Sequence, residues 1–219
     1  IAMSVKIIAF LKQLNENNNR EWFQNNKSKY IDAKDEFADI INKVIQSMAL
    51  YDIKLSRLQA NDSIFRIYRD IRFSRDKRPY KTHMGAYIAP GGRKSNHAGY
   101  YIHIEPNNTL LAGGSYRPPS NILKDIRSEI YFNASEYKAI INDQDFLNLF
   151  GGVRGNKLIR PPVGFPKDFE DIDLLKFKDY NIMHKVSDDF FEDDIFLNNV
   201  MVVCSKMKQF NDFLNRAID

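Results

Sequence analysis

Two histidines and a glutamate are the side chains of this sequence best suited to proton transfer. His103 and Glu105 alternate with apolar residues, so on a strand they share one face, about 7 Å apart at the Cα atoms. An imidazole beside a carboxylate can accept and return a proton. His83 joins them only if its segment pairs with that strand. We therefore predict His83, His103 and Glu105 as the acid–base groups if the chain is an enzyme, with ordinary hydrogen-bonded histidines as the competing interpretation.

Two histidines and a carboxylate could also hold a metal ion, but the spacing of these three residues does not match a recognised metal-binding signature. The chain has one cysteine and four histidines. A single cysteine excludes every multi-cysteine zinc site and any internal disulfide. We predict no bound metal and no cofactor. We also predict that folding requires no metal.

Basic side chains are concentrated between residues 64 and 94, where nine Lys and Arg face only Asp70 and Asp76. This local charge of +7 within a net charge of +4 leaves −3 for the rest of the chain. A confined basic patch favours one site for a phosphate- or carboxylate-bearing small molecule over nonspecific nucleic-acid binding. A nucleic-acid backbone is the less favoured ligand. A structural or partner-binding protein with an internal ion-pair ladder is the third interpretation.

The segment 61–83 carries most of this charge and has a two-residue alternation typical of a strand, which a turn at Asp76–Pro79 ends. It predicts a core face with Phe65, Ile67, Ile71 and Phe73 around Arg69. An arginine in that position needs a carboxylate, carbonyls or a bound anion, because a buried unpaired guanidinium costs several kcal/mol. The opposite face and its rim provide the predicted ligand-binding residues, which are Arg66, Tyr68, Asp70, Arg72, Lys81, Tyr101 and Arg117.

Segments with helical periodicity precede and follow the predicted strands in the sequence. Apolar spacing predicts one long amphipathic helix over 18–50, with Asn18 as its N-cap, and a last helical region that begins at Ser187 or Asp188. Short strands are predicted at 84–89, 99–105, 109–113 and 180–184, and turn-length links between consecutive strands indicate antiparallel pairing. The sequence therefore predicts an α+β fold. Its antiparallel sheet has four to six strands from residues 53–113 and 180–184, packed against a long N-terminal helix and a C-terminal helix.

The composition of the 219-residue chain, 43% hydrophobic and 27% charged, is that of a globular protein. We predict a single domain over 1–219, with Met3 as the initiator and residues 1–2 as a cloning remnant. No apolar run reaches the ~18–20 residues of a membrane helix, so no membrane partner is expected. One cysteine agrees with a cytoplasmic location, and Cys204 is predicted as a buried thiol. The sequence leaves the oligomeric state open.

Several stretches together resemble a known family. These are FLKQLNENNNREWFQNNKSKY, SIFRIYRDIRFSRDKRPYKTHMG, GYYIHIEP and GSYRPP, with RPPVGFPKD and IDLLKFK as looser matches. They resemble a family of microbial, bacterial proteins catalogued only as domain of unknown function 2461. The resemblance implies a single domain and carries over no activity, cofactor or catalytic residue. Asp70, Arg72 and Lys81 fall where such relatives have similar residues, which transfers a pattern without a role.

Overall fold

The fold is described by a computed structural model covering residues 5–219. The predicted initiator Met3 and the predicted remnant at 1–2 lie outside the described residues. The chain divides into two compact units. Unit 1 contains the chain up to residue 93 together with 101–111 and 185–201, and unit 2 contains 94–100, 112–184 and 202–219. The single domain over 1–219 stays a prediction.

The described residues form one antiparallel sheet of four strands, in the order β1-β2-β3-β4. Its strands are β1 (Met84–Ile88), β2 (Gly99–Ile104), β3 (Leu110–Ser115) and β4 (Tyr180–Lys185). Along β2, Tyr100, Ile102 and Ile104 are buried, whereas Tyr101 and His103 alternate with them on the opposite face, as the two-residue period requires. The predicted α+β class, with its antiparallel sheet and its long N-terminal and C-terminal helices, is confirmed.

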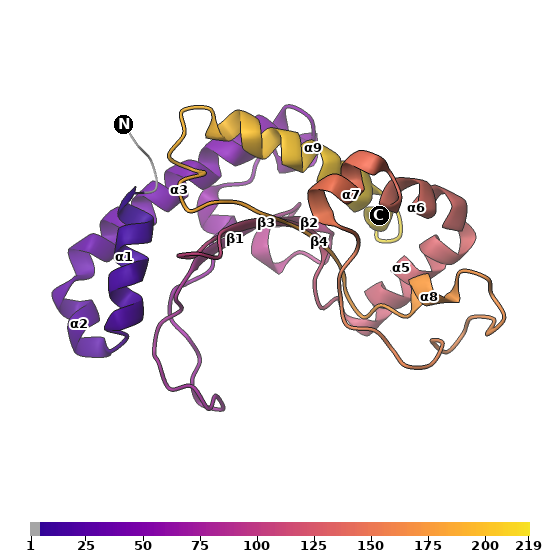
Figure 1. Cartoon of the computed structure of the whole chain (residues 1–219), viewed down its shortest axis with the longest axis horizontal. Helices are drawn as coiled ribbons and strands as arrows, with labels where there is room; N and C mark the ends of the chain where they lie inside the picture. The colour runs from indigo at the N-terminus through magenta and orange to yellow at the C-terminus, as the bar shows by residue number, and fades with distance from the viewer. Residues whose placement is uncertain (1–4) are drawn as a thin grey trace. The chain divides into compact units, whose positions relative to one another are not determined.

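The helices of unit 1 begin with three that pack together, α1 (Val5–Glu16), α2 (Arg20–Asn25) and α3 (Lys27–Ala49) (Figure 1). A 3-10 helix η1 (Ile53–Leu55) and α4 (Ala60–Ser63) follow. The apolar stripe of α3 is buried at Ala33, Phe37, Ile40, Ile41, Val44, Ile45 and Met48. At 1.5 Å per residue this helix is about 35 Å long.

The start of the N-terminal helical region differs from the prediction. The single helix expected over 18–50 is divided at Asn26, which ends α2 and begins α3. The N-cap of α2 is Asn19, whose side chain accepts a hydrogen bond from the Trp22 backbone N–H at 2.9 Å. Asn18 has another role, because its amide group pairs with both backbone groups of Tyr80 at 3.0 and 3.1 Å.

Residues 64–83, here called the basic hairpin, contain no strand of the sheet, so the strand predicted before the turn at Asp76–Pro79 is absent and only isolated bridges remain. They leave α4, fold back on themselves and return to β1, as the purple excursion in Figure 1 shows. Tyr68 and Tyr80 form an isolated antiparallel bridge. Ile67 is buried, but Phe65 is 38% and Phe73 95% exposed. The predicted core face is therefore wrong at Phe65 and Phe73. Phe73 lies near the tip of the hairpin, where none of the strands formed by residues 5–219 pairs with it.

Aromatic packing fixes the base of the basic hairpin on α2. The Tyr80 ring stacks on that of Phe23, with centroids 4.0 Å apart, and Tyr68 contacts both rings at 5.6–5.9 Å. Phe23 is almost completely buried. Together with the Asn18 amide, these rings hold the hairpin where its two arms leave the body of unit 1.

Unit 2 has its own helices and core. They are α5 (Ser120–Phe132), α6 (Ala134–Ile141), α7 (Gln144–Phe150) and α8 (Ile172–Leu175), with most of α9 (Phe196–Asn215). The 3-10 helix η2 (Gly92–Lys94) lies where unit 1 ends. The core rings of Tyr137, Phe210 and Phe213 pack at 5.1–6.1 Å. The predicted helix start at Ser187 or Asp188 is wrong, because residues 188–195 form turns and a bend and α9 begins at Phe196. None of the described helices is long and apolar enough to cross a membrane.

Candidate functional site

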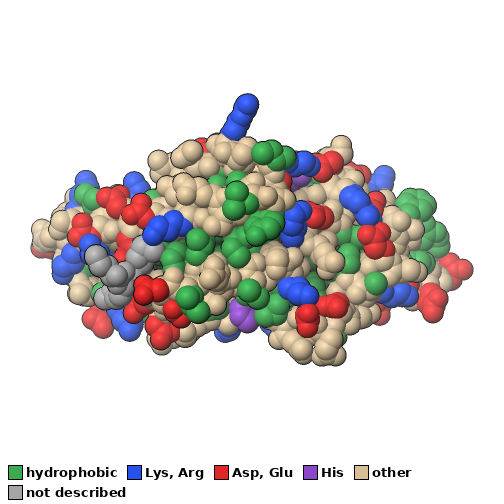
Figure 2. Space-filling view, turned by 90° about the horizontal axis from the view of Figure 1, so that it is seen from above, with side chains coloured by type: hydrophobic (Ala, Val, Ile, Leu, Met, Phe, Trp, Pro, Cys, Tyr) green, Lys and Arg blue, Asp and Glu red, His purple; other side chains and the backbone are tan. Residues whose placement is uncertain are grey.

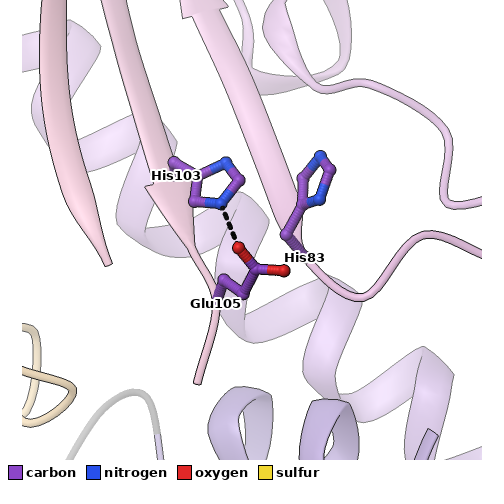
Figure 3. Close-up of side chains that lie close together, drawn as sticks. All are labelled: His83, His103 and Glu105. Carbon is purple, nitrogen blue, oxygen red and sulfur yellow. Dashed lines mark hydrogen bonds and ion pairs between the residues drawn. The ribbon is translucent and has the colours of Figure 1, made fainter. Parts of the chain in front are cut away.

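Three side chains of unit 1, His83, His103 and Glu105, form what we call the histidine cluster. His103 lies on β2, Glu105 follows the end of β2, and His83 directly precedes β1, the neighbouring strand. The imidazole rings lie 4.3 Å apart at their centroids, and Figure 3 shows the carboxylate close to both. One ligand atom from each residue lies within 4.8 Å of the others. Pairing of β1 with β2 therefore brings together the three residues predicted as acid–base groups.

A series of hydrogen bonds orients this cluster. The Tyr101 hydroxyl and His103 Nδ1 lie 3.0 Å apart, and His103 Nε2 and Glu105 Oε2 also lie 3.0 Å apart. The Thr82 hydroxyl donates to Glu105 Oε1 at 2.7 Å, and the Asn108 amide donates to Oε2 at 2.7 Å. The Glu105 carboxylate is thus held by three side chains, and His103 is fixed at both ring nitrogens.

The electrostatics of the cluster follow from burial and these hydrogen bonds. Burial, together with the nearby charges of His103 and Lys81, lowers the pKa of His83 to about 4, against a smaller opposing effect of Glu105. Burial by itself would raise the pKa of Glu105, but the hydrogen bonds from Asn108, His103 and Thr82 outweigh it and lower that pKa to about 2. At neutral pH, His83 is a neutral imidazole and Glu105 an ionised carboxylate.

Three further residues shape the cluster, and local sequence patterns do not identify them. A Cβ at Gly85 would lie 2.4 Å from the Tyr101 hydroxyl oxygen, so only glycine leaves room for that ring. Asn108 belongs to the turn after β2, and its sequence signal is that of a turn residue. Thr82 adjoins His83 without any pattern of its own. Their roles depend on which strands pair, which the local sequence does not specify.

The basic hairpin gives its charged residues different environments. The predicted need of Arg69 for a partner is met by Asp76 at 2.9 Å and by the Arg78 carbonyl at 2.8 Å. Arg72 donates two hydrogen bonds to Asp70, at 2.7 and 3.0 Å, and both side chains are largely exposed. This contact lowers the pKa of Asp70.

Tyr68, Arg72 and Arg117 are not joined to the histidine cluster by any contact found among residues 5–219. Tyr68 packs in the aromatic base of the hairpin. Arg117 belongs to unit 2, where its backbone N–H donates to Asp179 at 2.7 Å and its guanidinium lies over the Tyr116 ring.

Two cations near the cluster have no carboxylate partner. Among residues 5–219, neither Arg66 nor Lys81 forms an ion pair or a side-chain hydrogen bond. Lys81 is half-buried, with its ammonium group 5.5 Å from the centre of the Phe65 ring. Burial lowers the pKa of Lys81, and the positive charge of Arg66 lowers it further. On the face drawn in Figure 2, by contrast, acidic and basic side chains are interspersed.

Comparison with known proteins gives one match. The model of the family described as "Conserved hypothetical protein (DUF2461)" matches residues 6–213. The chain belongs to this family. No curated protein and no solved structure matches the chain at the significance required. Membership of DUF2461 confirms the resemblance noted in the sequence, and the family description names no activity that the histidine cluster would perform.

Proposed function

We propose that this member of DUF2461 binds a small anionic ligand, one that carries phosphate or carboxylate, at Arg66 and Lys81 beside the histidine cluster. The observation that carries the proposal is the pair of neighbouring cations without a carboxylate partner among the described residues. Asp70 feels the charge of Arg66, but Arg72 already holds that carboxylate. Two adjacent cations repel each other, and an anion placed between them relieves this repulsion.

The surroundings of Lys81 strengthen such an interaction. Its half-buried ammonium lies against Phe65, and Phe65 contacts the ring of Tyr101 at 6.4 Å between centroids. Partial desolvation makes a charge-assisted hydrogen bond stronger than it is in bulk water. Each such bond contributes about 1.5–3 kcal/mol, so loss of one cation corresponds to roughly a 10- to 100-fold weaker complex.

The test is titration calorimetry of the full chain with inorganic phosphate and with citrate at low salt, in metal-free buffer after EDTA treatment and dialysis. Binding is expected in the wild type and is expected to weaken as salt is added. Arg66→Ala and Lys81→Ala should each weaken it at least tenfold. Arg72→Ala is the matched control, because Arg72 is an exposed arginine of the same hairpin that is already paired with Asp70.

Two results would contradict this proposal. One is that neither anion binds the wild type. The other is that both variants bind as well as the wild type, which would favour the structural or partner-binding interpretation. Short oligonucleotides provide the test of the alternative ligand. If they bind, and if Arg72→Ala lowers their affinity as much as Arg66→Ala does, the ligand is a nucleic-acid backbone that contacts several basic residues of the hairpin.

An enzyme that acts on the same ligand is the second candidate function. It is favoured by the hydrogen-bonded series of Tyr101, His103 and Glu105, in which a base is oriented by a third group, as in many acid–base and nucleophilic sites. If the protein is an enzyme, it should turn over a phosphorylated substrate, and His103→Gln should abolish this turnover without changing the melting temperature.

A cytoplasmic location is part of the proposal, since the chain has one cysteine.

A further inference from the structure

We infer that His83, His103 and Glu105 bind one divalent transition-metal ion, zinc or iron(II). Two imidazoles and one carboxylate are a ligand set that these ions accept in proteins, with the remaining coordination positions open. One ligand atom from each residue already lies within 4.8 Å of the others. The inference deepens the proposed function, since a bound cation beside Lys81 and Arg66 would add to the attraction for an anion.

The distances are close to those of a formed site. Ligand atoms about 2.0–2.2 Å from a common ion lie roughly 3–4 Å from one another. His103 Nε2 and Glu105 Oε2 are separated by 3.0 Å, so a metal ion can replace the proton that they share. The remaining separations involve His83 and are at most 4.8 Å between ligand atoms, so this side chain would have to move closer when the ion binds.

His83 is the least explained member of the cluster in the absence of a ligand. No hydrogen bond to its ring is found among residues 5–219, where its contact is with the ring of His103. It is only partly exposed, although polar side chains that leave water normally find a partner. A metal ion gives the ring nitrogen that partner.

The surrounding residues already do what partners of metal ligands do. A metal-bound histidine generally uses its second ring nitrogen in a hydrogen bond, and a metal-bound carboxylate is itself hydrogen-bonded. Tyr101 occupies Nδ1 of His103, and Thr82 and Asn108 donate to Glu105. The sequence predicted no metal because the three ligands have no signature spacing and are brought together only by the pairing of β1 with β2.

The test is titration calorimetry with ZnCl₂ on the full chain, after EDTA treatment and dialysis. One equivalent of zinc per chain is expected to bind. His83→Ala, His103→Ala and Glu105→Gln should each weaken binding at least 100-fold, and cobalt(II) should give a visible absorption band that these variants lose. His184→Ala is the matched control, because this histidine belongs to unit 2, where it is hydrogen-bonded to the Leu149 carbonyl.

One further variant, at a residue that orients a ligand without binding the metal, distinguishes loss of zinc binding from loss of folding. Tyr101→Phe keeps all three ligands and removes the hydrogen bond to His103, so a 10- to 100-fold loss of zinc affinity is expected. Circular dichroism checks the fold of every variant. The inference is wrong if the folded wild type binds no zinc at micromolar concentrations, or if the three ligand variants still bind one equivalent.

The two proposals fail separately. Phosphate binding is measured in metal-free buffer and depends on Arg66 and Lys81, whereas zinc binding is measured without an added anionic ligand and depends on the histidine cluster. Phosphate binding that survives in His103→Ala, with zinc binding lost in the same variant, would be consistent with both proposals.

Discussion

Glu105 shows how single side chains set the chemistry of this region. Its burial opposes the charged form, yet three hydrogen-bond donors keep the pKa near 2, because donors to a carboxylate stabilise its ionised state. Only one of these donors, His103, was singled out from the sequence. The other two, Asn108 and Thr82, lower the pKa of this carboxyl as well.

Gly85→Ala tests whether close packing positions Tyr101. The added Cβ would lie 2.4 Å from the Tyr101 hydroxyl oxygen and 3.0 Å from two ring carbons. Because contacts this short force the ring to move, we expect a loss of about 1–3 kcal/mol in the free energy of unfolding. Urea denaturation followed by circular dichroism measures it.

The control for this variant is a double-mutant cycle with Tyr101→Phe. Removing the hydroxyl removes the shortest contact, so Gly85→Ala should cost less in the Tyr101→Phe background than in the wild type. Equal costs in both backgrounds would show that the hydroxyl does not conflict with the new methyl group.

At the scale of elements, the basic hairpin is stable at its base and exposed at its tip. Phe23, Tyr68 and Tyr80 pack where its arms join unit 1, and Asn18 adds two hydrogen bonds to the Tyr80 backbone. Toward the tip, ion pairs such as Asp70 with Arg72 lie in solvent, where each contributes little to stability. The base therefore holds Arg66 and Lys81 in place.

The contrast between Phe23→Ala and Phe73→Ala tests this description. Phe23 is 1% exposed and contacts several rings, so its truncation should lower the free energy of unfolding by about 3–5 kcal/mol. Phe73 is 95% exposed, and its truncation should change stability by less than about 0.5 kcal/mol. Chemical denaturation of both variants gives the comparison. A large loss in Phe73→Ala would support the core face that the sequence predicted.

At the scale of the whole molecule, each unit buries its own aromatic groups. Phe23 and Tyr80 pack in unit 1, and Tyr137 and Phe210 pack in unit 2. Strands β2 and β3 and helix α9 each contribute residues to both units. Unfolding of either unit therefore involves elements that continue into the other.

Cys204 provides a probe of unfolding in unit 2. It is buried on α9, and burial raises the pKa of its thiol from 9.0 to about 12. The folded state favours the neutral thiol, so this contribution to stability is complete below pH 9 and is lost as the pH rises toward 12. At pH 8, iodoacetamide should modify Cys204 only in molecules that open, because the thiolate is the reactive form.

Mass spectrometry after timed exposure to iodoacetamide, with and without urea, measures this reaction. We expect modification to be complete in urea and to be much slower in the native protein. Equally fast modification in both would mean that the thiol is accessible in the folded state.

Local periodicity in the sequence determined the regular elements. The spacing of apolar residues predicted a helix that includes α3, although as one helix over 18–50. Local patterns and turns predicted the four strands, and the alternation in β2 separated Ile102 and Ile104 from Tyr101 and His103. These features follow from periods of 3.6 and 2 residues, which can be recognised within a single segment of the sequence. Family membership was visible in the same way, from contiguous motifs.

Tertiary structure alone decided which of these residues meet. A two-residue alternation defines two faces but does not say whether a neighbour covers one of them, so the segment predicted as a central strand became a hairpin with Phe73 exposed. Antiparallel pairing brings His83 to His103 across 20 residues of sequence, whereas the pair of Asp70 with Arg72 is a local contact between residues two positions apart. Contacts between distant segments arise from the packing of whole elements, and the local sequence carries no direct signal of them.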